Sequence, residues 1–518
     1  MLVQITSTLR NLLFRYSGAA GCAVLLLVPF TLGLYGIDEP SAGTLSEPLR
    51  IMIALILASV IGGSIVQYPV AGFSILAAFL PFLGFIRRGL IPTIGYQSNE
   101  PLTLIGAAVG TLLFVRIASN RWISTKNITV KLAIALLGVM FLQIFNPKQG
   151  GILVGLGGAL FYIGPLMWFF VARHHGNKQT LSNICSVILF TSVIAAIVGL
   201  RQQFVEMSDV EKYWMVVSKY RQVLSNDTVR VFGIALSFGE YVTLMSMGAM
   251  VAWSRFLQRK YLYALPFAFI AASIFLSSSR GGVIMLLAGC IVSWSFLDKR
   301  SAKRLPRILV GVGLGVLGLQ LGLSQTRALS LDRTSAVFVE HQVEGLSNPF
   351  GSERSTATKH VGLMEIGFMS GIKNPIGQGL GSTTIAGRRF NQGGTDGEDG
   401  TFSTELDFTN IIVSTGFVGG ILYLVLMGRM SWVIIKLWDV TRASSSLEWI
   451  AIAIVTFGNW LQGGYYAPSI LIWSCYGIMD KLLEQEGVSV RPGKIVNTVM
   501  SLLPQKFRPL SRTGLPNR

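Results

Sequence analysis

A short polar run, SSSRGG, interrupts two apolar stretches of the chain and holds the residues best suited to chemistry. Arg280 offers a planar fork that can bind two phosphate oxygens at once, and it is a candidate catalytic residue. Its neighbours Ser279, Gly281 and Gly282 are candidates for substrate binding, because glycines let a ligand approach the backbone. A tight helical turn whose arginine reaches the membrane interface is the alternative explanation.

A second arginine, Arg230, stands just before an apolar stretch that contains Glu240. Ionisable side chains in or at the end of a membrane span are expensive, and they are functional candidates by default. Arg230 is therefore a second candidate catalytic residue. For Glu240 we favour the alternative of a protonated carboxylic acid that is hydrogen-bonded inside a helix bundle.

Two carboxylates, Glu405 and Asp407, open a later apolar stretch. Residues two apart do not share a helix face, so only one of them can point into a given site. That carboxylate could accept a proton from a substrate, while the other caps the helix N-terminus. Both are candidate catalytic residues, and capping alone is the alternative.

The composition indicates the elements that must position these residues. Of 518 residues, 51% are hydrophobic and only 13% are charged, against roughly 25% charged residues in soluble domains. Apolar runs of about 16 to 25 residues recur along the chain, each long enough to cross a bilayer. The sequence predicts an all-α, polytopic transmembrane helical bundle and excludes a soluble enzyme.

We predict about fourteen spans. Their centres fall near residues 28, 58, 78, 109, 138, 161, 190, 243, 268, 289, 315, 420, 455 and 473. The positive-inside rule then places most basic connections, the N-terminus and the C-terminus in the cytoplasm. The exception is Arg87-Arg88, which this topology places outside.

The topology divides the chain into a transmembrane helical domain, 1–484, and a basic cytoplasmic tail, 485–518. Two outer loops, 201–230 and 325–406, are long enough to do chemistry, and structureless loops of that length are usually functional. A short helix on the membrane surface is expected just before Lys373.

Several other classes of function are not expected. The net charge of +18 fits cytoplasmic loops and lipid headgroups better than nucleic acid. Neither the four cysteines nor the histidines have metal-ligand spacing, so no metal or cofactor is predicted. The GQGLGS segment lacks the GK[ST] ending of a nucleotide-binding loop, which argues against ATP hydrolysis.

Three local matches make the chain resemble the O-antigen ligase and Wzy polymerase superfamily. The first is the Ser-Arg-Gly-Gly turn, Ser279–Gly282, between two central spans. The second is an arginine followed by a glycine, Arg230 and Gly233, at the opening of the preceding outer-side helix. The third is a large late loop with Arg354 and then Pro375–Gly379, a Pro-x-Gly-x-Gly run. The resemblance covers roughly residues 201 to 420.

The resemblance also suggests which branch of the superfamily fits. A ligase signature aligns its glycines on Gly416 and Gly419, which places Glu405 where ligases have a histidine. Polymerase-like members vary at this position and often have acidic residues. The resemblance therefore favours a polymerase over a ligase.

The resemblance implies a GT-C-like fold and a metal-independent glycosyltransferase of the bacterial inner membrane. It would polymerise undecaprenyl-diphosphate-linked oligosaccharide repeat units on the periplasmic face, with a flippase and a chain-length regulator as partners. The alternatives are an O-antigen ligase or protein O-oligosaccharyltransferase and, from other classes, a polysaccharide transporter or flippase or a structural scaffold.

The resemblance also implies roles for the candidate residues. Arg280 and Arg230 would stabilise the leaving diphosphate, and Glu405 or Asp407 would accept the proton of the attacking sugar hydroxyl. The late loop would order itself around the saccharide through its substrate-binding candidates, which are Arg354, Lys373, Gly377, Gly379 and Gly381.

Overall fold

The computed structural model describes residues 46–97, 100–218, 220, 229–297, 306–315, 356–384, 406–461 and 465–487. Within these ranges the regular elements are helices, so the expected all-α class is confirmed there. The predicted span near residue 28, most of the 325–406 loop and nearly all of the 485–518 tail lie outside the described residues.

The helices follow one another with short connections. In the first half they are α2 (Ser46–Gln67), α3 (Pro69–Gly89), α4 (Ile91–Ile94), the 3₁₀ turn η1 (Pro101–Leu104), α5 (Ile105–Ser119), α6 (Ile128–Gln143), η2 (Pro147–Gln149), α7 (Ile152–His175), α8 (Lys178–Phe204) and α9 (Asp209–Val217). In the second half they are α10 (Phe238–Leu257), η4 (Tyr261–Tyr263), α11 (Ala264–Leu276), α12 (Arg280–Ser295), α15 (Thr356–Lys373), α17 (Asp407–Thr441), α18 (Ser444–Val455) and α19 (Tyr466–Gln485).

Several of these helices suit a bilayer. Among the described residues, six are long and apolar enough to cross a membrane: Pro48–Gln67, Pro69–Gly89, Pro101–Ser119, Ile152–His175, Lys178–Phe204 and Asp407–Thr441. Shorter apolar helices, including α6, α11, α12 and α18, accompany them. The apolar helices indicate a membrane protein, and the count of fourteen spans stays a prediction.

Helix directions are fixed by pairs of contacts along each interface. Helices α8 and α10 are antiparallel: the Ser192 hydroxyl donates to the Leu244 carbonyl oxygen at 2.8 Å, and Gly199, nearer the end of α8, faces Tyr241, nearer the start of α10. A Cβ on Gly199 would lie 2.2 Å from the Tyr241 hydroxyl. The end of α8 and the start of α10 therefore lie together, and we call this the site end of the bundle.

Helices α7 and α19 run in the same direction. Phe161 and Tyr466 pack edge to face with ring centroids 5.9 Å apart, and about three to four turns further on Arg173 pairs with Asp480. The interface is close, because a Cβ on Gly477 would lie 2.0 Å from the Phe169 carbonyl oxygen. Small residues that let helix backbones approach are typical of membrane helix bundles.

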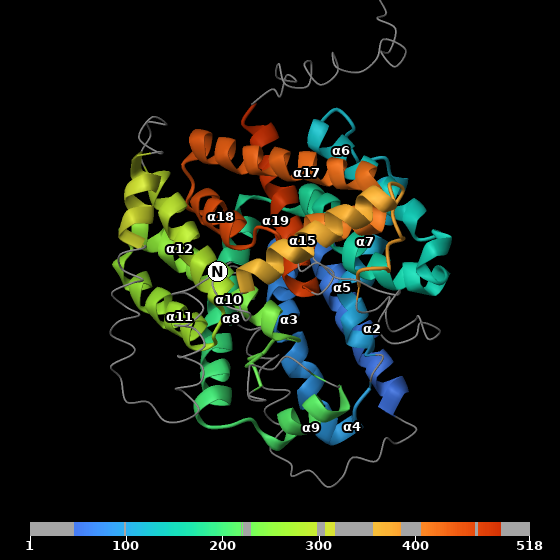
Figure 1. Cartoon of the computed structure of the whole chain (residues 1–518), viewed down its shortest axis with the longest axis horizontal. Coiled ribbons are helices and arrows are strands. Elements are labelled where there is room, and N and C mark those ends of the chain that lie inside the picture. Colours follow the sequence, from blue (N-terminus) through green and yellow to red (C-terminus); the bar gives the residue numbers. More distant parts are fainter. Residues whose placement is uncertain are drawn as a thin grey trace, which may run out of the picture.

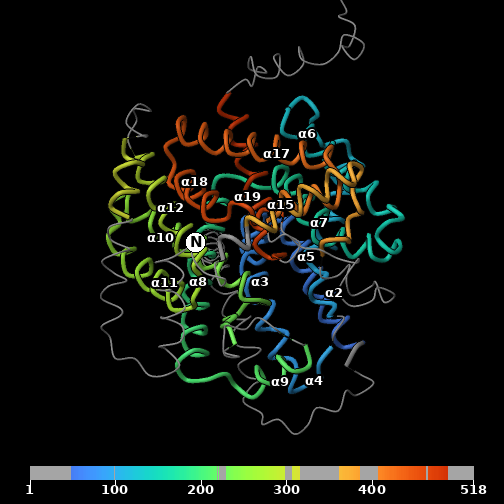
Figure 2. Tube along the Cα trace, in the orientation of Figure 1, coloured from blue at the N-terminus to red at the C-terminus, as the bar shows by residue number. Residues whose placement is uncertain are grey.

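The ends of α3 and α8 reach the short helices α9 and α4, which lie together at the lower edge of the view (Figure 1). The chain trace shows α17 beside α6 and α15, with α18 and α19 next to it (Figure 2). Helix α17 contains one non-helical residue, Gly416, at a kink.

Two arginines at the opposite end of the bundle form ion pairs between helices. Arg173 at the end of α7 binds both Asp480 and Glu484 of α19. Arg255 of α10 donates from Nε to Glu448 of α18 at 2.9 Å. Buried charges require such partners, so these pairs hold α7 against α19 and α10 against α18.

Candidate functional site

The SSSRGG run forms the turn between α11 and α12. Ser277 and Ser278 are buried, and Ser278 has a positive φ of 59°. Ser279 is the N-cap of α12, and its hydroxyl accepts a hydrogen bond from the backbone N–H of Gly282 at 3.2 Å. Arg280, half-buried, is the first residue of the helix. The structure therefore gives Ser279 a capping contact.

The two glycines of the turn have different surroundings. A Cβ on Gly282 would lie 2.8 Å from Cγ1 of Val242 on α10, so this glycine permits close packing of the two helices. A Cβ on Gly281 would meet no atom within 4 Å, and the residue is exposed. Only Gly281 keeps the open backbone that a substrate could approach.

This turn lies at the site end of the bundle. The side-chain amide of Gln203, near the end of α8, donates to the carbonyl oxygen of Leu276 at 2.9 Å. Together with the contact of Gly282 on Val242, this bond brings four helix ends to one place. They are the last turns of α8 and α11 and the first turns of α10 and α12.

Arg230 lies beside the start of α10. Its guanidinium carbon is 4.8 Å from the ring centroid of Phe238, the first residue of that helix. Arg230 is half-buried. Arg230 and Arg280 thus stand at the N-terminal ends of two packed helices, where helix dipoles add partial positive charge. The sequence candidates from two clusters therefore share one end of the molecule.

The chain between Arg230 and α10 is held by Arg88 from the last turn of α3. The Arg88 fork donates to the carbonyl oxygens of Gly233 at 2.6 Å and Ala235 at 2.9 Å. Its guanidinium carbon lies 4.6 Å from the ring centroid of Phe232 and 5.3 Å from that of Trp214. Arg88 therefore faces the 201–235 region, as the predicted topology requires if that region is outside.

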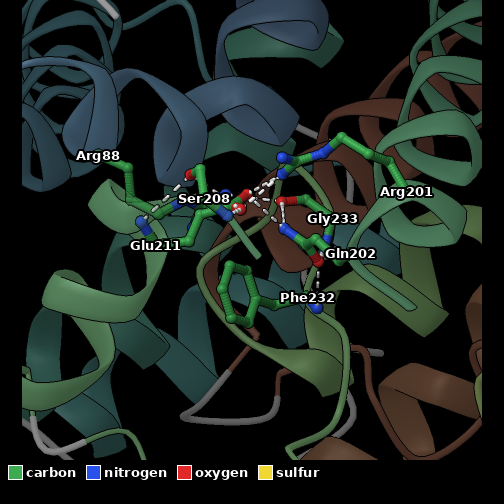
Figure 3. A network of polar contacts seen from close by, with 7 residues as sticks. All are labelled: Arg88, Arg201, Gln202, Ser208, Glu211, Phe232 and Gly233. Atoms are coloured by element: carbon green, nitrogen blue, oxygen red, sulfur yellow. Dashed lines mark hydrogen bonds and ion pairs between the residues drawn. The ribbon is translucent and has the colours of Figure 1, made fainter. Parts of the chain in front are cut away.

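Gln202 holds the same segment from α8 (Figure 3). Its side-chain oxygen accepts hydrogen bonds from the backbone N–H groups of Phe232 at 3.1 Å and Gly233 at 2.8 Å. Its side-chain amide donates to the Gly233 carbonyl oxygen at 3.2 Å and to Glu211 at 2.7 Å. Gly233 has a positive φ of 53°, a conformation that favours glycine.

Glu211 of α9 fixes Gln202 in turn (Figure 3). Its carboxylate accepts from Arg201 at 2.5 and 2.6 Å and from the backbone N–H of Ser208 at 2.8 Å. Burial alone would raise the pKa of Glu211, but its hydrogen bonds to Gln202 and Ser208 and the nearby guanidinium groups hold that pKa below its ordinary value. The Glu211 side chain therefore stays ionised in this network at neutral pH.

Glu240 lies in the first turn of α10 and is buried. Its carboxyl oxygens accept from the backbone N–H groups of Ala467 at 3.2 Å and Leu236 at 3.3 Å. Ala467 belongs to the first turn of α19, so Glu240 joins two helix starts. These hydrogen bonds agree with a carboxyl group held inside the bundle, and the protonated state expected for it stays a prediction.

Asp407 is the first residue of α17 and is fully enclosed, with 0% of its surface exposed. One carboxylate oxygen accepts from the Tyr423 hydroxyl and from the backbone N–H groups of Trp460 at 2.8 Å and Leu461 at 3.2 Å. Its backbone N–H donates to the Gly458 carbonyl oxygen at 2.9 Å. The residue anchors α17 to the connection between α18 and α19. The other candidate carboxylate, Glu405, lies outside the described residues, as does Arg354.

The glycines of the Pro-x-Gly-x-Gly run pack against protein. Gly377, Gly379 and Gly381 are buried, and the first two have φ values of 96° and 99°. Backbone N–H groups of the run bond to the α17 carbonyl oxygens just before the kink at Gly416, at 2.9 and 3.1 Å. A Cβ on Gly377 would lie 2.6 Å from the Gly416 nitrogen. Lys373, by contrast, is exposed at the end of α15.

Polar side chains at the end of α6 and in η2 hold the other side of this run. The Gln143 amide donates to the Ile376 carbonyl oxygen at 2.7 Å. The side-chain oxygen of Gln149 accepts from the Gly381 N–H at 3.0 Å. In the structure these glycines let the run fit between α6 and α17, so their contacts are with protein backbone and glutamine side chains.

Arg88, Gln202 and Gln143 were not among the sequence candidates. One signal for Arg88 is present in the sequence, because Arg87-Arg88 is the exception to the positive-inside pattern. In the structure this arginine has a local role: Arg88 is 2% exposed and donates its hydrogen bonds to backbone carbonyl oxygens. Glutamines in apolar helices are a weaker signal, since nothing in the sequence gives their partners.

Within the described ranges no group of three or more His, Cys, Asp or Glu side chains could hold a metal ion. Neither a scan against protein-family models nor a search of curated proteins finds a match to this chain.

Proposed function

We propose that this protein is a membrane glycosyltransferase that polymerises undecaprenyl-diphosphate-linked oligosaccharide repeat units on the extracytoplasmic face of a bacterial inner membrane. The observation that carries the proposal is the placement of Arg230 and Arg280 at the first turns of α10 and α12, which pack through Gly282 and Val242. Two guanidinium groups and two helix dipoles favour the negative charge that develops on a leaving diphosphate.

The rest of the proposal follows the resemblance. A carboxylate at the start of α17 accepts the proton of the attacking hydroxyl, which makes that oxygen a better nucleophile at the anomeric carbon. The new glycosidic bond forms as the bond to the diphosphate breaks. About fourteen spans in a GT-C-like arrangement, cytoplasmic termini, and a flippase and chain-length regulator as partners belong to the same proposal.

The sequence at Glu405 supports a polymerase over an O-antigen ligase or protein O-oligosaccharyltransferase, because the ligase histidine is absent. The lipid-linked species that accumulate when the gene is deleted separate these activities. Single repeat units on undecaprenyl diphosphate are expected. Accumulated long polymer would indicate a ligase, and repeat units retained on the cytoplasmic face would indicate a flippase.

The direct test is Arg280→Lys in the purified protein, with lipid-linked repeat units as substrate. A compact ammonium cannot reproduce the planar fork on two phosphate oxygens. Loss of a contact that strengthens in the transition state is expected to lower the rate by about 30- to 1,000-fold. Arg121→Lys, at an exposed position on the α5–α6 connection, is the control. Normal polymer synthesis by a well-folded Arg280→Lys variant would contradict the diphosphate role.

A further inference from the structure

We propose that Arg88 is a positioning residue for Arg230, an assignment that rests on the proposed glycosyl transfer. Arg88 acts through the backbone of residues 231–237, which lead from Arg230 into α10. The segment is buried for most of its length although it is not helical. Its peptide groups therefore need hydrogen-bond partners from outside the segment.

Helix α3 supplies partners along one side of the segment. Arg88 binds the carbonyl oxygens of Gly233 and Ala235, and the backbone N–H of Phe85 donates to the carbonyl oxygen of Ile234 at 2.9 Å. The contact needs a glycine, because a Cβ on Gly84 would lie 2.1 Å from the Ala235 oxygen. Three successive carbonyl groups are thus bound by one turn of α3.

The partners of Arg88 are unusual for a buried charged side chain. Its side chain is 2% exposed, and among the described residues no carboxylate oxygen lies within 4.0 Å of its nitrogens. Backbone carbonyl dipoles and the rings of Phe232 and Trp214 surround the guanidinium instead. A buried cation stabilised in this way loses that stabilisation if the segment moves, so the segment is held firmly.

Gln202 fixes the segment from the opposite side. Its contacts to Phe232 and Gly233 are locked by Glu211, which Arg201 and Ser208 hold in place. Side chains from α3, α8 and α9 therefore converge on the two residues that follow Val231.

We call the contacts of Arg88 and Gln202 with residues 231–237 the clamp. The position of Arg230 depends on the clamp at both ends of this segment. Its backbone lies two residues before Phe232, and its guanidinium lies over Phe238, where the segment ends and α10 begins. A shift of the segment would move both the backbone and the ring against which the side chain packs. Misplacement of a catalytic group by about 1 Å can lower a rate by 100-fold.

A double-mutant cycle tests the assignment. Arg88→Met removes the two donors with little change in length, and we expect it to lower kcat/KM by about 10- to 100-fold. In an Arg230→Ala background the same change should cause little further loss, because there is no guanidinium left to position. Losses that multiply across the two positions would overturn the positioning role.

Hydrogen exchange provides a readout that needs no activity. Arg88→Met should increase backbone exchange in residues 229–237, whereas Arg87→Met should not, because Arg87 lies by Glu100 at 4.0 Å instead. Arg88→Lys should restore part of both properties, since an ammonium can donate to the carbonyl oxygens without a fork. Unchanged exchange in a folded Arg88→Met protein would overturn the clamp.

Three further outcomes are distinguished. If Arg88→Met does not fold, Gln202→Leu releases the same segment from the α8 side and should show the same non-additivity with Arg230→Ala. If the wild-type protein makes no polymer from lipid-linked repeat units, the proposed function fails, and the exchange data still decide whether the clamp exists. If Arg230→Ala keeps full activity, the positioning role fails.

Discussion

At the scale of single residues, burial restricts what each carboxylate at the start of α17 can do. Asp407 is fully enclosed and binds the Tyr423 hydroxyl and two backbone N–H groups. Its second oxygen has no hydrogen-bond partner among the described residues. A general base must reach the hydroxyl that it deprotonates, which favours Glu405 as the base and Asp407 as the anchor.

Glu405→Gln and Asp407→Asn are therefore expected to impair different properties of the protein. The first should leave folding intact and lower turnover by about 100-fold, within the usual range for general-base loss. The second should lower thermal stability, since hydrogen bonds to a charged group are worth about 1.5 to 3 kcal/mol. Polymer synthesis and melting temperature, measured on both variants, separate these effects. An inactive Asp407→Asn protein of normal stability, with an active Glu405→Gln protein, would reverse the roles.

At the scale of elements, the kink in α17 depends on two glycines that face each other, Gly416 in the helix and Gly377 in the late loop. Gly416 has a φ of 71°, and a Cβ there would lie 2.1 Å from the Pro375 carbonyl oxygen. The Pro-x-Gly-x-Gly run occupies the break and bonds to the freed helix carbonyl groups. The Pro-x-Gly-x-Gly run and the break in α17 therefore form one structural unit.

Replacing Gly416 and replacing Gly428 should therefore change the stability of the protein in opposite directions. Gly416→Ala adds a Cβ at a residue with φ 71° and ψ −171°, a conformation essentially restricted to glycine, which costs about 1 to 3 kcal/mol before the clash with Pro375 is counted. Gly428→Ala, in open space later in the same helix, should stabilise the protein by about 0.5 to 1 kcal/mol. Thermal unfolding in detergent compares them. Equal melting temperatures for the two variants would exclude the tight contact.

The α9 network should weaken on acidification. Because the pKa of Glu211 is lowered by folding, its stabilising contribution is fully present above its ordinary pKa of 4.5 and is lost as pH falls through the lower folded value. The protection factors of the Asp209–Val217 amides, which correct for the intrinsic pH dependence of exchange, should fall below about pH 4 in the wild type. Glu211→Gln should flatten this dependence over the same range. A pH dependence that persists in the Gln variant would assign it to another group.

At the scale of the whole molecule, the two ends of the bundle differ in their charged contacts. At the site end Arg88 binds backbone carbonyl oxygens and Arg201 pairs with Glu211, whereas Arg173 and Arg255 at the opposite end pair with carboxylates of neighbouring helices. Arg230 and Arg280 lie beside two helix starts at the site end, where the helix dipoles also favour an anion. This asymmetry is a property of the assembled bundle.

Cysteine labelling of intact spheroplasts tests which end faces outward. In a cysteine-free background, Glu206→Cys on the α8–α9 connection should react with a membrane-impermeant thiol reagent. Arg121→Cys, exposed on the α5–α6 connection, should react only after the membrane is disrupted. The reverse labelling pattern would place the arginine-bearing end in the cytoplasm and exclude chemistry on an extracytoplasmic lipid-linked donor.

The sequence by itself determined the helical membrane class and singled out the candidate residues. Apolar runs long enough to cross a bilayer predict helices because backbone groups in lipid must bond within their own segment. The SSSRGG turn and Arg230 also stand out without a structure, since charges beside apolar helices are costly. The predicted centres near 58, 78, 109, 138, 161 and 190 all fall in described helices.

Tertiary structure alone decided which polar residues meet. Arg88 lies 145 residues before Gly233 and 147 before Ala235, and Gln143 lies 233 residues before Ile376. Carbonyl groups carry no sequence signature, so a side chain that binds backbone cannot be matched to its partner from residue types. The same limit applies to the glycines of the late loop, whose buried place against α17 depends on a kink that only the assembled helices define.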